Sequence, residues 1–213
     1  MEITTLIIIA ALVMSIVIHE VAHGFMANWL GDPTARLAGR LTLNPVSHAD
    51  PIGSVILPGF LALTGSGLLF GWAKPVPYNP YNLKNQRWGE VLVAAAGPAV
   101  NIVIALVFSL IIRLAPGLSL SSAFLELASY IVYMNIVLAF FNLIPVPPLD
   151  GSKILTGFLP LSLEIKYRRF GDALAQMGVL SMVLFIFIFI YVLSAPFQVL
   201  VKTIFALLTG SQF

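Results

Sequence analysis

The chain has 213 residues, of which 59% are hydrophobic and 9% are charged. A soluble globular domain carries about 25% charged residues, so this composition excludes that class and indicates a membrane protein built of spanning helices. The net charge is only +2, and no basic run indicates a nucleic-acid partner. The absence of cysteine excludes disulfides and thiolate ligands. Any metal ion must therefore be held by His, Asp or Glu side chains.

The first predicted element is an apolar helix over residues 3–29. It lacks the basic start of a signal peptide, and its apolar run continues without a cleavage site, so we expect a retained membrane helix. Residues 34–43 then alternate mostly apolar or small side chains with polar ones, which predicts a half-buried strand. The apolar segment 52–71 follows and is interrupted by prolines and glycines.

The second half of the chain predicts helices over 90–114 and 124–143, the latter ended by the prolines of NLIPVPPLDG. A polar stretch precedes a last apolar segment, which begins near residue 177 and is interrupted at Pro196. We expect one all-α polytopic membrane domain over 1–213. It would have about four full transmembrane helices, a re-entrant segment and a short membrane-associated β element. Its metal-binding core would cover about 1–158, and its C-terminal helical segment about 176–209.

Two histidines and a glutamate lie within five positions of the first helix, in the sequence HEVAH. Residues i and i+4 share one helix face, so His19 and His23 can hold one metal ion together. Glu20 can take a proton from water at that metal instead of binding it. The alternative is a set of hydrogen-bonded core groups. Charged groups at membrane depth cost about 2.5–3.5 kcal/mol each, which favours the metal site.

A catalytic zinc site has three protein ligands and one open position. Asp150 follows a proline-rich break and precedes Gly151, where the chain can turn a carboxylate inward. It can equally serve as the N-cap of a short following helix. His48 is the second candidate for the third ligand, although its surroundings, NPVSHADP, look like a surface turn.

Three sequences in this order, HEVAH, AAAGPAVN and NLIPVPPLDG, resemble the site-2 protease family of intramembrane zinc metalloproteases. GDPTARLAGRLTLNP and FGWAKPVPYNP resemble its small prokaryotic members, which lack a PDZ or CBS domain. The match covers most of residues 14–158. The resemblance implies that His19, His23 and Asp150 bind one Zn²⁺ per chain and that Glu20 is the catalytic base.

Charge and geometry favour a re-entrant path for residues 52–71. If this segment dips in and returns, nine Lys and Arg residues fall on one side and only Arg113 and Lys202 on the other, as the positive-inside rule requires. If it crosses, the split is seven against four, and the HEVAH sequence and Asp150 reach opposite faces. We therefore expect an external N-terminus and an active site that faces the cytoplasm of a prokaryotic cell.

Asn101 and Asn142 are polar residues within predicted helices. Their amides could bind a substrate backbone or a developing oxyanion, and the alternative is hydrogen bonding between helices. Residues 71–82 are either an edge strand that pairs with an unwound substrate or an interfacial loop. The sequence KYRRF, 166–170, is most simply an inner-face anchor on anionic lipid.

These observations favour an intramembrane zinc endopeptidase. The resemblance implies that its substrate is a membrane-anchored protein cut within or near its transmembrane segment. The expected partners are that protein and the lipid bilayer, without nucleic acid. The alternatives are a divalent-metal transporter, which needs several weak sites along a path, and a non-catalytic membrane scaffold. One cluster with an intact Glu20 argues against both.

Overall fold

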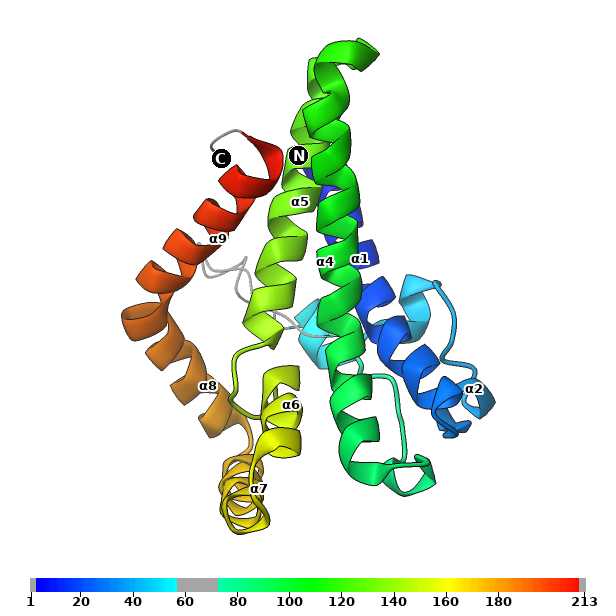
Figure 1. Ribbon diagram of the computed structural model, residues 1–213, viewed down its shortest axis with the longest axis vertical. Coiled ribbons are helices and arrows are strands. Elements are labelled where there is room, and N and C mark those ends of the chain that lie inside the picture. Colours follow the sequence, from blue (N-terminus) through cyan, green and yellow to red (C-terminus); the bar gives the residue numbers. More distant parts are fainter. Residues whose placement is uncertain (1–2, 57–72, 211–213) are drawn as a thin grey trace. The chain divides into compact units, whose positions relative to one another are not determined.

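The computed structural model describes residues 3–56 and 73–210. The chain falls into two compact units, Met1–Gly89 and Glu90–Phe213, and in the described ranges its regular elements are all helices (Figure 1). Four helices are long and apolar enough to cross a membrane: Thr5–Trp29, Gln86–Gly117, Ser122–Asn142 and Val183–Thr209. The predicted all-α polytopic membrane protein with about four spans is confirmed. The expected single domain stays a prediction.

The first unit is built on α1 (Ile3–Trp29), whose bounds agree with the predicted helix. The helix ends because Gly31 adopts a positive φ of 112°, which glycine tolerates without a steric penalty. The turn is closed by the Asp32 N–H, which donates to the Ala27 carbonyl at 2.9 Å. The unit also contains α2 (Thr34–Leu37), η1 (Pro45–His48), η2 (Pro51–Ile56) and η3 (Pro80–Asn82). Residues 57–72, which hold most of the predicted re-entrant segment, lie outside the described residues.

The predicted strand over 34–43 is wrong. Residues Thr34–Leu37 form the short helix α2, closed by a hydrogen bond from the Leu37 N–H to the Pro33 carbonyl at 2.9 Å. Gly39 then turns the chain with a φ of 66°. The alternation of side chains does not become an alternation of burial, because Ala35 is buried while Leu37 is exposed. Local hydrogen bonds satisfy this backbone, and within the described ranges no strand is present to pair with it.

The Asp32 carboxylate connects the end of α1 to the segment before α4 (Gln86–Leu118). One oxygen accepts from the N–H and hydroxyl of Thr34 and from the Asn82 amide at 2.8 Å. The other accepts from the Asn79 N–H at 2.6 Å. Burial alone would raise the pKa of Asp32, but these hydrogen bonds outweigh it and hold the pKa below its ordinary value.

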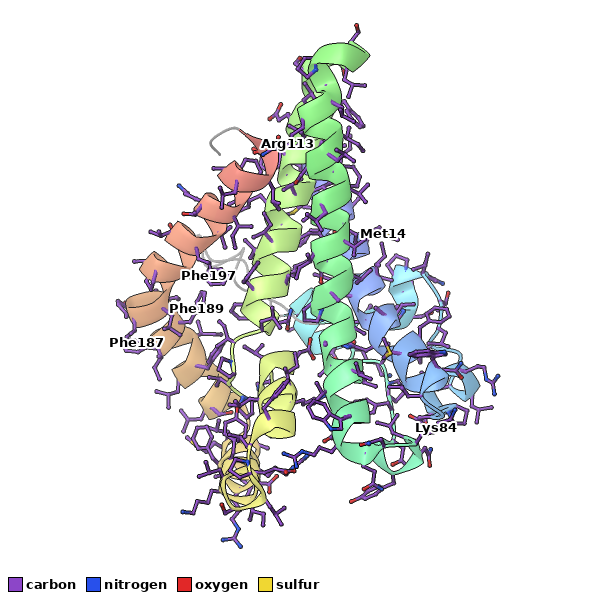
Figure 2. The ribbon with its side chains drawn as sticks, viewed as in Figure 1. Met14, Lys84, Arg113, Phe187, Phe189 and Phe197 are labelled. Carbon is purple, nitrogen blue, oxygen red and sulfur yellow. The ribbon has the colours of Figure 1, made fainter. Side chains whose placement is uncertain are left out.

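The second unit is built on three long helices, α4, α5 (Ser122–Asn142) and α9 (Ser194–Thr209). At 33 residues, α4 extends beyond its predicted bounds at both ends. Its Arg113 donates to the carbonyls of Leu207 and Leu208, and so caps the C-terminal end of α9 with a cation, as the helix dipole favours. Figure 2 shows Arg113 near this end of α9. The core of the unit is formed by Ala105, Val132, Ile136, Val201 and Phe205.

Shorter helices connect α5 to α9. The break over residues 143–149 leads into α6 (Asp150–Phe158), and the polar stretch forms α7 (Leu161–Gln176). Arg168 of α7 is 2.7 Å from Glu90 of α4 and 3.0 Å from Glu164, and the bond with Glu90 raises the pKa of Arg168. The last apolar segment is bent into α8 (Val179–Ile188), the π-helical η4 (Phe189–Leu193) and α9. Phe189 of η4 and Phe197 of α9 are labelled in Figure 2, and the rings of both pack edge-on against the ring of Phe141.

We predict that Asp32→Asn lowers the thermal unfolding midpoint at neutral pH, because the new NH₂ group cannot accept the bonds that the carboxylate accepts. A lowered pKa means that the ionised group stabilises the fold above its ordinary pKa of 3.8. This stabilisation is lost as the pH falls through the folded-state pKa. Between about pH 5 and about pH 3, the midpoint of the variant should therefore fall less than that of the wild type. Asp172→Asn, on the exposed side of α7, is the control and should follow the wild type.

Candidate active site

The two histidines of α1 lie close enough to share a metal ion. Their Nε2 atoms are 3.1 Å apart, and their rings meet edge to face, with centroids 4.7 Å apart. Two ligands each about 2.0–2.1 Å from a tetrahedral zinc lie about 3.3 Å apart. The spacing of the His19 and His23 nitrogens therefore fits this ligand geometry. His19 is buried and His23 is half-buried, so the pair is largely, but not fully, shielded from solvent.

Glu20 is fixed by the backbone of a distant segment. Its Oε2 accepts a hydrogen bond from the Val76 N–H at 3.0 Å. The carboxylate is half-buried and belongs to the same turn of α1 as His19. A carboxylate next to the histidine pair is suited to accept and return a proton.

Gly24 allows the Val76 segment to lie against α1. A Cβ at Gly24 would lie 2.8 Å from Cγ1 of Val76 and 2.6 Å from Cδ2 of Leu41, which is closer than real Cβ contacts. The absence of a side chain therefore makes the approach of this segment to the Glu20 turn possible. This role of Gly24 is not evident from the sequence. The only signal for it was a glycine in the interior of an otherwise apolar helix, directly after the second histidine.

Asp150 is the first residue of α6 in the second unit, and Leu149 occupies the N-cap position. The alternative in which Asp150 is the N-cap is therefore wrong. Gly151 positions the aspartate, because a Cβ on this residue would collide with the Leu143 carbonyl and lie 2.6 Å from the Ile144 oxygen. Only glycine lets the first turn of α6 pack on the end of α5. Asp150 and Gly151 therefore act together: the glycine allows the close packing, and the aspartate begins the helix.

His48, the second candidate for the third ligand, has a structural contact. Its ring Nε2 lies 2.8 Å from the Thr42 carbonyl, and the side chain is 1% exposed. The expectation of a surface turn is therefore wrong for this side chain. The ring ties the last residue of η1 to the loop between α2 and η1.

The two asparagines make helix contacts. The Asn101 amide donates to Oδ1 of Asn135 at 2.7 Å, which joins α4 to α5 as the interhelical alternative expects. Asn142 donates to the Leu138 carbonyl of its own helix at 2.9 Å. Both Asn101 and Asn135 are fully buried. A role of Asn101 or Asn142 toward a substrate stays a prediction.

Comparison with known proteins places the chain in a family. The profile of peptidase family M50 matches residues 7–128 and 109–185. A Bacillus subtilis protein provisionally named zinc metalloprotease YwhC is 38% identical over 165 residues, which are 75% of this chain and 72% of the relative. The Mycolicibacterium smegmatis protein provisionally named zinc metalloprotease Rip2 is 29% identical over 68% of this chain. Its Mycobacterium tuberculosis counterpart is 30% identical over 70%.

The chain therefore belongs to peptidase family M50, the site-2 protease family, and it is an integral membrane protein with four candidate spans. It covers about half the length of the mycobacterial relatives, 54% and 55%. No solved structure gives a significant match.

We predict that Gly151→Ala destabilises the protein by about 1–3 kcal/mol, the usual cost of forcing extra atoms into a packed site. The new methyl group must displace the backbone of Leu143 and Ile144. The matched control is Gly117→Ala, also within a helix, where nothing lies within 4 Å of an added Cβ. Denaturant or thermal unfolding in detergent measures both. Equal stability of the two variants would contradict the packing role of Gly151.

Proposed function

We propose that this protein is an intramembrane zinc endopeptidase. The observation that carries the proposal is the pair of histidine nitrogens, 3.1 Å apart, on a helix long and apolar enough to span a membrane. Membership of peptidase family M50 supports hydrolysis over transport, as do the zinc metalloprotease names of the relatives.

His19, His23 and Asp150 are the proposed zinc ligands, with one ion per chain. Two imidazoles and one carboxylate are donors of the kinds that zinc accepts, and three protein ligands leave the open position that catalysis requires. When bound, zinc supplies a Lewis acid for the scissile carbonyl and lowers the pKa of water. Gly151 keeps the Asp150 carboxylate at the start of α6.

Glu20 is the proposed general base and acid. Its carboxylate takes a proton from the attacking water and returns it to the leaving amine. The Val76 N–H holds one of its oxygens at 3.0 Å, which limits the directions that the carboxylate can take. Asn142 and Asn101 remain proposed contacts of the substrate backbone or oxyanion. Each amide already donates one hydrogen bond, Asn101 to Asn135 and Asn142 to Leu138.

The proposed substrate is a membrane-anchored protein, cut within or near its transmembrane segment in regulated intramembrane proteolysis. The unequal distribution of Lys and Arg supports an active site that faces the cytoplasm. Under this proposal the whole chain, 1–213, acts as one membrane metalloprotease domain.

The test of the site compares two variants in proteoliposomes that contain single-span membrane proteins as substrates. Glu20→Gln should keep about one zinc per chain and lose cleavage by about a hundredfold or more, because the amide cannot accept a proton. Asp150→Ala should lose most of the zinc. Metal analysis and gel-based cleavage measure both effects. Cleavage by Glu20→Gln at the wild-type rate would refute the role of Glu20, and full zinc content in Asp150→Ala would remove Asp150 as a ligand.

The orientation can be tested separately, because the chain has no cysteine and single-cysteine variants give one label each. Lys84→Cys, in the exposed turn before α4, should react with an impermeant reagent only from the cytoplasmic side. Ser122→Cys, at the exposed start of α5, should react only from outside. Labelling of Lys84→Cys from outside alone would reject the proposed orientation.

A further inference from the structure

The segment that contacts Glu20 has no regular structure of its own. Residues 73–79 form neither helix nor strand, so their position depends on contacts with other parts of the chain. The sequence here is Lys-Pro-Val-Pro, 74–77. Pro75 and Pro77 have no N–H group, which leaves Lys74 and Val76 as the only backbone donors of the four residues. Both donors are used, the Lys74 N–H toward His48 and the Val76 N–H toward Glu20.

Two residues hold the segment at Lys74. The His48 carbonyl accepts from the Lys74 N–H at 2.8 Å. The Arg40 guanidinium donates through Nη2 to the Lys74 carbonyl at 2.8 Å, and the same atom is 3.5 Å from the Pro75 carbonyl. The Lys74 peptide is therefore held on both its N–H and its C=O side.

Of the two partners of Lys74, His48 is itself fixed. The His48 ring is bound to the Thr42 carbonyl at 2.8 Å and is almost fully buried. The Asn44 side chain caps the start of η1 by accepting from the Val46 N–H at 3.1 Å. On the other side, Val76 is 6% exposed and lies in the notch that Gly24 leaves in α1. From this buried position the Val76 N–H donates to Glu20 Oε2 at 3.0 Å.

We propose that Arg40 and His48 are positioning residues for Glu20. They fix the Lys74–Val76 segment, the segment holds the Val76 N–H against Oε2, and this bond sets the direction of the carboxylate. Neither residue touches the reacting atoms. The inference rests on the proposed role of Glu20 as general base, and it assigns to the 40–48 loop a part in the rate of the chemical step.

The experiment compares Arg40→Met, which keeps an apolar stem but removes the donors, with Arg40→Lys and the control Arg36→Met. Arg36 is an exposed arginine on α2, four residues away. Hydrogen exchange is followed at residues 74–77, where only the Lys74 and Val76 amides can report. Zinc content, the unfolding midpoint, and kcat and KM on a fluorescently tagged single-span membrane protein in proteoliposomes are measured on the same samples.

Arg40→Met should lose protection at the two amides and keep its zinc. Its kcat should fall about tenfold to a hundredfold, the cost of a misplaced catalytic group, with KM within about twofold of the wild type. Arg40→Lys, which can still reach one carbonyl, should recover part of both effects, and Arg36→Met should match the wild type. Wild-type exchange and kcat in Arg40→Met would overturn the proposal. So would a parallel loss of zinc, midpoint and kcat, since that pattern indicates a general structural role.

The exchange measurement needs no activity, so it separates this inference from the proposed function. If the wild type cleaves nothing, the proposed function fails. Loss of Val76 protection in both Arg40→Met and Glu20→Ala would then still establish the contact. If the wild type cleaves its substrate but Glu20→Ala leaves the Val76 amide as protected as before, the positioning contact is refuted. The proposed endopeptidase function is then unaffected.

Discussion

Backbone hydrogen bonding at the ends and breaks of helices governs this structure. In an apolar environment an unsatisfied N–H or C=O costs several kcal/mol, so each point where a helix stops needs its own set of partners. At the end of α1, Gly31 allows a closing turn and Asp32 collects the donors that follow. At Lys74–Val76 a nonhelical segment is fixed by a guanidinium, a carbonyl and a carboxylate. In the second case, the residues that satisfy the backbone are the ones proposed to position Glu20.

The sequence was sufficient to predict the long elements. Continuous apolar runs predicted α1 with its bounds, and α4 and α5 to within a few residues, because a membrane helix needs only length and apolar character. The period-two pattern over 34–43 misled, because Pro33 and the Asp32–Thr34 contacts close a local helical turn. Periodicity reports which face a strand would bury, but it cannot show whether a second strand is present to pair with.

The histidine pair could be predicted because both residues share one helix, so their distance follows from helical geometry. The contact of Glu20 could not be predicted, because its partner is Val76, 56 positions later in the chain. It also depends on how the backbone of Lys74 and Val76 is held. The role of Gly24 was hidden for the same reason, since it depends on side chains that approach from Leu41 and Val76. The burial of His48 was also missed. A turn-like sequence says nothing about what packs over it.

The two charged residues of α4 described above have a consequence for the surrounding lipid. Glu90 and Arg113 are about 35 Å apart along the helix at 1.5 Å per residue, close to the hydrocarbon thickness of about 30 Å. Glu90 binds Arg168 of α7, and Arg113 binds the last carbonyls of α9. Each attachment is therefore placed for a headgroup region. A bilayer thinner than this spacing must tilt α4 or bring lipid headgroups to its charges. Either response changes the surroundings of both attachments at once, because Glu90 and Arg113 belong to the same helix.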